Sequence, residues 1–202
     1  MRTLLLTLMV ALAAACAPGD APAELGGLRG VELGAPIPRP QFTLAATDGQ
    51  PYDFYERTKG KLTFLFFGYT HCPDICPVHV ANVASVLRTL SFEDRARAQF
   101  VFVTVDPARD SLPLLKNWLA QFDDTFIGLV GSLDSVNAVQ ATINLPPAII
   151  PEPDADGNYF PGHAAQVLVF EEDDVARLLY PFGTRQVDWA NDIPILLARH
   201  KQ

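Results

Sequence analysis

Two apolar runs constrain the fold of this chain more than any other feature. Leu62–Phe67 and Phe100–Val105 each have the length of one strand, and such runs are typical of strands that are covered on both faces. Apolar residues recur at helical spacing after each run, over 73–90 and over 111–122. This alternation of strand and helix predicts an α/β sheet with helices on both faces.

Shorter segments extend this pattern at both ends. An Asp-Gly turn at 47–50 separates two short strands, which predicts an N-terminal β-hairpin over 41–54. The remaining expected elements are a strand and a helix over 126–143, a hairpin over 166–180 whose acidic turn 171–174 is exposed, and a terminal helix over 188–200 that is bent or restarted at Pro194.

Composition limits the classes of function. The chain has 202 residues, 49% of them apolar, which is enough to build the core of one domain. A formal net charge of −8 argues against nucleic acid as a partner. Three cysteines cannot form a dense disulfide framework, so each of them needs its own explanation.

The N-terminus has the layout of an export signal. Arg2 precedes the apolar run Leu4–Leu12, and three alanines stand directly before Cys16. The run is shorter than the roughly 20 residues of a transmembrane helix. Small residues before a cysteine resemble a bacterial lipobox, so we expect 1–15 to be a lipoprotein-type signal peptide and Cys16 to be lipidated. Plain cleavage, which leaves a free thiol, and an uncleaved anchor stay open as alternatives.

The segment after Cys16 is rich in chain-breaking residues. Five prolines and five glycines lie within 17–40, a composition that is typical of a linker. We therefore expect 16–40 to be a flexible tether that holds a soluble domain, 41–202, near a membrane surface.

The other two cysteines directly follow the first apolar run. Cys72 and Cys76 are four residues apart, so a helix that begins near Pro73 would place both thiols on one face at its N-terminus. Backbone N–H groups at such a terminus stabilise thiolates. Two thiolates so placed can form a disulfide or bind a soft metal, whereas two core cysteines are the plainer alternative.

A metal at this place would need a further ligand. Two sulfurs and one imidazole suit copper, Cu(I) above all, better than a structural zinc ion, which takes four protein ligands. His163 is the favoured imidazole, because it precedes a central strand and can face a helix N-terminus across the sheet end. Three other histidines stay open: His79 lies two helical turns from Cys72, His71 is expected to point away, and His200 is expected to be solvated in the last turn.

Three separated motifs resemble one known family. Gly68–Pro77 resembles the cysteine signature of the Sco/SenC family, Val105–Ser111 matches its second signature with serine for threonine at the end, and His163 occupies the place of its distal histidine. The resemblance spans about 36–202. It implies a thioredoxin-like fold and one copper ion per domain, Cu(I) and/or Cu(II), held by Cys72, Cys76 and His163.

The resemblance also implies a function. Proteins of this family are copper metallochaperones that serve the CuA centre of cytochrome c oxidase, or thiol–disulfide oxidoreductases that reduce the cysteines of that centre, with Cys72 and Cys76 as the redox pair. The implied partners are the CuA-bearing subunit and another periplasmic copper chaperone. The implied place is the outer face of a bacterial inner membrane, lipid-anchored, as a monomer. A thiol peroxidase on the same fold is a weaker alternative.

Two features favour copper over reduction. The pair is spaced Cys-x-x-x-Cys, whereas thioredoxin-type reductases use Cys-x-x-Cys, and His163 stands near the place of their cis-proline. Asp106, in the second signature, either ends a strand or supports the metal ligands from behind. Asp110 or Ser111 is expected to cap the next helix. The proline-rich stretch 144–161 is long for the family and adjoins His163, so it can alter access to the metal.

Overall fold

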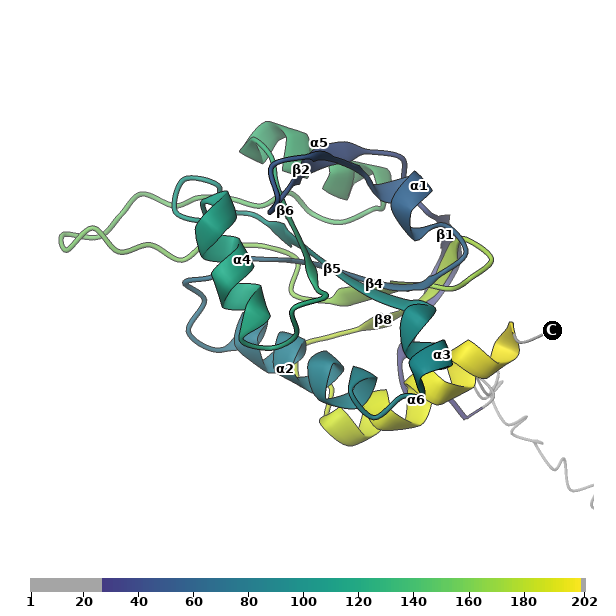
Figure 1. The fold of residues 1–202 in the computed structure, drawn as a ribbon. Helices are drawn as coiled ribbons and strands as arrows, with labels where there is room; N and C mark the ends of the chain where they lie inside the picture. Colours follow the sequence, from purple (N-terminus) through teal and green to yellow (C-terminus); the bar gives the residue numbers. More distant parts are fainter. Residues whose placement is uncertain (1–26, 201–202) are drawn as a thin grey trace, which may run out of the picture.

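The computed structural model describes residues 27–200, which form one eight-stranded mixed sheet with helices packed against it (Figure 1). The predicted α/β class, with a central mixed sheet and flanking helices, is confirmed. The predicted signal peptide 1–15 and Cys16 lie outside the described residues. In chain order the elements are β1 (Val31–Pro38), β2 (Thr43–Ala46), β3 (Pro51–Asp53), α1 (Phe54–Thr58), β4 (Leu62–Gly68), α2 (Ile75–Leu87), α3 (Phe92–Ala96), β5 (Ala98–Thr104), α4 (Leu112–Ala120), β6 (Ile127–Val130), α5 (Leu133–Thr142), β7 (Val167–Phe170), β8 (Val175–Tyr180) and α6 (Gln186–Arg199).

The strand order brings two loops that are distant in sequence to one end of the sheet. The order is β1-β8-β7-β4-β5-β6-β2-β3, in which β4, β5 and β6 are parallel while β7 runs antiparallel to β4. Phe66 near the end of β4 pairs with Val167 at the start of β7. The loop that leaves β4 and the loop that enters β7 therefore meet at the same end of the sheet.

Helices cover both faces of this sheet. In Figure 1, α2, α3 and α6 lie on one side of the strands, and α5 lies with α1 on the other. Every residue of β4 is buried, as the apolar run predicts, and β5 is buried except for half-buried Gln99. The segment between α5 and β7 extends away from this body, at the left of the view.

The predicted tether is wrong at its C-terminal end, because 31–38 form β1. This strand pairs antiparallel with β8, through Val31 with Leu179 and Pro38 with Val175, and a register shift falls between Glu32 and Ile37. It lies at one edge of the sheet, a position where proline is tolerated because one side needs no ladder hydrogen bonds. Proline content alone therefore misidentified an edge strand as a linker.

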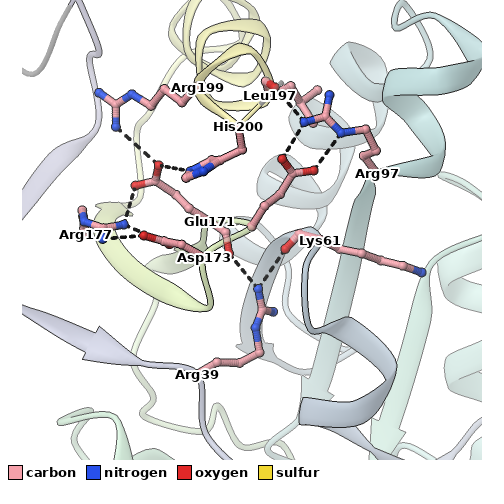
Figure 2. Close-up of polar contacts among 10 residues, drawn as sticks. Arg39, Lys61, Arg97, Glu171, Asp173, Arg177, Leu197, Arg199 and His200 are labelled. Atoms are coloured by element: carbon pink, nitrogen blue, oxygen red, sulfur yellow. Dashed lines mark hydrogen bonds and ion pairs between the residues drawn. The ribbon is translucent and has the colours of Figure 1, made fainter. Parts of the chain in front are cut away.

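The predicted exposed turn between β7 and β8 is also partly wrong. Glu171 is only 2% exposed, and its carboxylate receives contacts from Arg177, Arg199 and His200, at 3.4, 3.5 and 3.3 Å (Figure 2). Its backbone carbonyl accepts a hydrogen bond from buried Arg39 at 2.9 Å. Cationic partners from β8 and α6 thus let a carboxylate enter the interior, which an acidic run does not reveal.

The terminal helix is longer than expected. α6 begins two residues earlier than predicted and continues through Pro194 as one helix. Its buried side chains include Trp189, Ile193 and Leu197, and this packing offsets the backbone hydrogen bond that proline removes.

Candidate metal centre

Cys72 lies in the loop between β4 and α2, just before the helix. The helix begins at Ile75, two residues later than expected, so only Cys76 lies in its first turn. The backbone N–H of Cys76 donates to Sγ of Cys72 at 3.4 Å. The Cys72 sulfur thus occupies the place of a capping side chain at the N-terminus of α2. Pro77, the third residue of α2, fits there because the first N–H groups of a helix have no intrahelical partner.

The two thiols have opposite tendencies to ionise. A hydrogen bond from the Cys76 thiol, together with the backbone N–H groups of Cys76, Asp74 and Ile75, lowers the pKa of Cys72 to about 5. That same thiol hydrogen bond, with burial, raises the pKa of Cys76 well above its usual range. The pair therefore holds one thiolate, on Cys72, and one proton, on Cys76, at neutral pH.

The sulfur of Cys76 is packed against the end of β4. Cys76 is fully buried, and a Cβ on Gly68 would lie 2.9 Å from its Sγ and 3.0 Å from the ring of Phe102. A side chain at position 68 would occupy space that the sulfur now fills. Cys72, by contrast, is 8% exposed, so it is the thiol that solvent or a partner reaches first.

His163 lies on the approach to β7, where the topology brings it beside the cysteine loop. Its ring packs edge-on against Tyr69, with centroids 5.6 Å apart. Its Nδ1 lies 3.0 Å from the carbonyl oxygen of Ala164, which can only accept, so this contact is a hydrogen bond when Nδ1 carries the ring proton. Burial lowers the pKa of His163, which keeps the imidazole neutral, as a metal ligand must be.

These three side chains lie at one end of the sheet but do not form a closed metal site. Within residues 27–200, no three His, Cys, Asp or Glu side chains are arranged as a ready-made metal centre. Cys72 and Cys76 are both free thiols. One thiolate, one buried thiol and one neutral imidazole nevertheless form a soft donor set of the kind that copper prefers.

The structure assigns the other three histidines to different places. His79 is 1% exposed, its Nε2–H donates to the carbonyl of Ala165 at 3.1 Å, and burial lowers its pKa to about 4. Nδ1 of His71 faces Thr70 and Asp110. The expectation that His200 is solvated is only partly met, because its Nε2 faces buried Glu171 (Figure 2).

Asp110 does not serve as the expected helix cap, because Ser111 is the N-cap residue of α4 and its side chain makes no capping hydrogen bond. Asp110 is fully buried and accepts hydrogen bonds from the backbone N–H and the hydroxyl of Thr70, at 2.9 and 2.5 Å, and from the hydroxyl of Thr104 at 2.6 Å. This carboxylate therefore ties the end of β5 to the loop that carries Cys72. The second signature contains Asp110, but sequence alone did not show that its side chain reaches across to that loop.

Asp106 is also buried, at 1% exposure, and contacts the projecting segment 149–162 between α5 and β7. It pairs with Arg109, and the hydroxyl of Tyr159 donates to its Oδ1 at 2.9 Å. The structure therefore gives Asp106 a role that was not expected, a link between the second signature and the stretch that leads to His163, and its support of the metal ligands stays a prediction. Arg109 and Tyr159 were not among the predicted site residues.

A family model decides between the classes of protein that share this fold. The SCO1/SenC model matches residues 32–198, most of the chain. The chain belongs to the SCO1/SenC family. The matched range contains both cysteines, the second signature and His163, and the predicted membership of this family is confirmed.

Solved structures and curated relatives agree with the SCO1/SenC assignment. The chain is similar to apo Sco1 from Thermus thermophilus, with a TM-score of 0.73, 28% identity and coverage of 84% of this chain and 96% of that one. It is also similar to a copper-bound ScoI from Bradyrhizobium japonicum, with a TM-score of 0.68, 30% identity and coverage of 79% and 99%. The predicted thioredoxin-like Sco fold is thus confirmed.

Mitochondrial SCO2 of Saccharomyces cerevisiae is 38% identical over 109 residues, which are 54% of this chain and 34% of the yeast protein. The chain spans less than two thirds of the length of the first curated relatives that it matches. Among residues 27–200, no helix has the length and apolar character that crossing a membrane requires.

Proposed function

We propose that this protein binds one copper ion through Cys72, Cys76 and His163 and passes it to the CuA-bearing subunit of cytochrome c oxidase. The observation that carries the proposal is the meeting of two different segments at one sheet end: a thiolate-stabilising helix start after β4 and a neutral imidazole before β7. Copper bound to the ScoI relative supports the choice of metal.

The donor set suits transfer of the ion. Cys72 is already a thiolate at neutral pH, whereas Cys76 must release its proton when copper binds. His163 supplies a neutral nitrogen from a separate segment, so it can join or leave without disturbing the two sulfurs. A partner's own thiols and imidazoles can then replace these ligands one at a time.

Location follows from the N-terminal segment. A lipid on Cys16 and the linker that follows would keep the domain at the outer face of a bacterial inner membrane, where the oxidase subunit and another periplasmic copper chaperone would meet it. We place the protein there as a monomer.

The inequality of the two thiols favours one second candidate, a thiol–disulfide oxidoreductase. The Cys72 thiolate would attack a disulfide of the oxidase subunit, releasing one of its thiols and forming a mixed disulfide. Cys76, on losing its proton, would then attack Cys72, which frees the second thiol and leaves a Cys72–Cys76 disulfide. Two electrons pass to the target, and an external dithiol must return them.

Copper titration and redox titration of the same preparation separate the two functions. For the chaperone, the reduced protein should bind one Cu(I) tightly enough to compete with a chelator such as bathocuproine disulfonate, and the Cys72→Ser variant should bind far less. Reduction of a disulfide-containing oxidase-subunit domain is measured in parallel by mass spectrometry. A strongly reducing pair with negligible copper affinity would contradict the chaperone function and favour the reductase.

A further inference from the structure

We propose that Arg109 is a positioning residue for His163, acting through the rings of Tyr69 and Tyr159. This inference deepens the proposed function and depends on it, since it assumes that His163 is the imidazole ligand. The relevant surroundings are the projecting segment 149–162, which ends directly before His163, and the loop that carries Cys72.

The guanidinium of Arg109 contacts two aromatic rings that belong to different segments. Its central carbon lies 3.6 Å from the ring centroid of Tyr159 and 5.9 Å from that of Tyr69. Both distances lie within the range of cation–π attraction. Nη2 of Arg109 also donates to the backbone carbonyl of Tyr159 at 3.2 Å. One side chain thus holds both the ring and the backbone of Tyr159.

The buried carboxylate of Asp106 holds both Arg109 and Tyr159 in place. Asp106 pairs through Oδ2 with Nε of Arg109 and accepts the hydroxyl of Tyr159 on Oδ1. Arg109 keeps 26% of its side chain exposed, whereas Asp106 keeps 1%. Removing Arg109 would leave a buried carboxylate without its cation, so the three side chains act as one unit.

Both contacts of Arg109 lead to His163. Tyr69 packs edge-on against the imidazole with an interplanar angle of 89°. Tyr159 precedes His163 by four residues, on a segment whose base is closed by hydrogen bonds between Ile149 and Gly162, at 2.8 and 2.9 Å. Arg109 therefore restrains the ring that packs on the imidazole and also the chain that delivers it.

Restraint of this kind affects how long the nitrogen ligand stays on the metal. An imidazole whose neighbours are fixed loses little conformational freedom on binding copper, whereas one on a loose segment loses more. We expect Arg109 to slow the release of copper without contacting the ion. In this proposal Arg109, in the second signature, restrains His163 through the long stretch 144–161.

The test compares Arg109→Met, Arg109→Lys and Tyr159→Phe with the control Arg95→Met. Arg95 is matched to Arg109 in exposure, at 23%, and pairs with Asp123 away from the site. The first readout is the rate of Cu(I) transfer to bathocuproine disulfonate. The second is the NMR line width and chemical shift of the His163 ring in metal-free protein, and the third is the melting temperature.

Arg109→Met should release copper about tenfold faster than wild type, the scale seen when groups behind a metal ligand are removed. Arg109→Lys keeps the charge over the rings and should be intermediate, as should Tyr159→Phe, which keeps the ring. Arg95→Met should leave both copper release and the His163 resonances at their wild-type values.

Two results would overturn the proposal. One is an Arg109→Met protein whose melting temperature falls while copper release and the His163 resonances stay unchanged. The other is an Arg95→Met protein with the same acceleration as Arg109→Met. If the wild-type protein binds no copper, the proposed function fails, and the metal-free NMR readout still tells whether Arg109 restrains His163.

Discussion

The backbone N–H of Cys76 points at the sulfur of Cys72 across 3.4 Å, so the first turn of the helix that contains one cysteine helps to hold the other as a thiolate. This relationship makes the pair unequal before any metal or partner arrives. It also explains a four-residue spacing, which lets the first sulfur precede the helix while the second is buried inside its first turn.

Alkylation of the metal-free protein should report this inequality. Because the pKa of Cys72 is lowered to about 5, its thiolate persists at neutral pH, and its reactivity should fall only as the pH drops through about 5. Cys76, whose pKa is raised, should stay unmodified under the same pulse. Iodoacetamide labelling followed by peptide mass spectrometry measures both. A midpoint near 8.5 for Cys72, the value of an ordinary thiol, would contradict the assignment.

Replacing His163 and His79 one at a time should show which of the two binds copper. His163→Ala should remove the nitrogen contribution from the Cu(II) spectrum and weaken Cu(II) binding more than the roughly tenfold to hundredfold that the loss of a group behind a ligand costs, while a Cys72–Cys76 disulfide can still form. His79→Leu should retain the nitrogen signal, because the Nε2–H of His79 is bonded to Ala165 and its ring lies in the core. Electron paramagnetic resonance of both variants is decisive, and wild-type ligation in His163→Ala would show that the wrong residue was chosen.

A methyl group at the end of β4 should disturb the buried sulfur. In Gly68→Ala the new Cβ would meet Sγ of Cys76 at 2.9 Å and the Phe102 ring at 3.0 Å, so the helix start or the ring must shift. We expect a loss of about 1–3 kcal/mol in the free energy of unfolding and weaker Cu(I) binding. Gly34→Ala is the control, since nothing lies within 4 Å of its added Cβ. Equal melting curves for the two variants would contradict this packing argument.

Removing the buried carboxylate of Asp110 should lower the free energy of unfolding more than removing an exposed carboxylate does. Asp110→Ala leaves the N–H and hydroxyl of Thr70 and the hydroxyl of Thr104 without their acceptor, at an expected cost of about 1–3 kcal/mol. Hydrogen exchange at the Thr70 amide should accelerate as well. Glu152→Ala, an exposed change on the projecting segment, should leave both quantities unchanged. An unchanged Thr70 exchange rate in Asp110→Ala would refute this tie between the strand end and the cysteine loop.

Much of this architecture could be predicted because single runs of sequence encode it. The strands β4 and β5 are apolar on both faces, and the spacing of Cys72 and Cys76 indicates a helix start. The edge strand β1 could not be recognised, since its prolines and exposed residues resemble a linker until β8 is beside it. Glu171 was expected in solvent for a similar reason, because its cationic partners lie on other elements.

The same limit applies to the site. The thiols and the imidazole of the proposed site are predicted from local patterns and the family resemblance, but the residues that support them are not. Asp110 bonds to Thr70, and Arg109 bonds to Tyr159, although 40 and 50 positions separate these residues in the sequence. Helix and strand periodicity does not predict contacts over such separations. Contacts of this kind follow from the way β5 is placed between β4 and β6, and they become visible only when the fold is known.

The antiparallel pairing of β7 with β4 has a consequence for the order in which the site is made. A growing chain presents its cysteine loop long before the residues around His163 exist, so a nascent chain can offer both sulfurs but not the imidazole of His163. The nitrogen arrives only when β7 docks beside β4, after the parallel strands β4, β5 and β6 have been made. The proposed three-donor site would thus be a late product of folding, and a chain truncated before β7 would hold both thiols without the histidine that we propose as the third ligand.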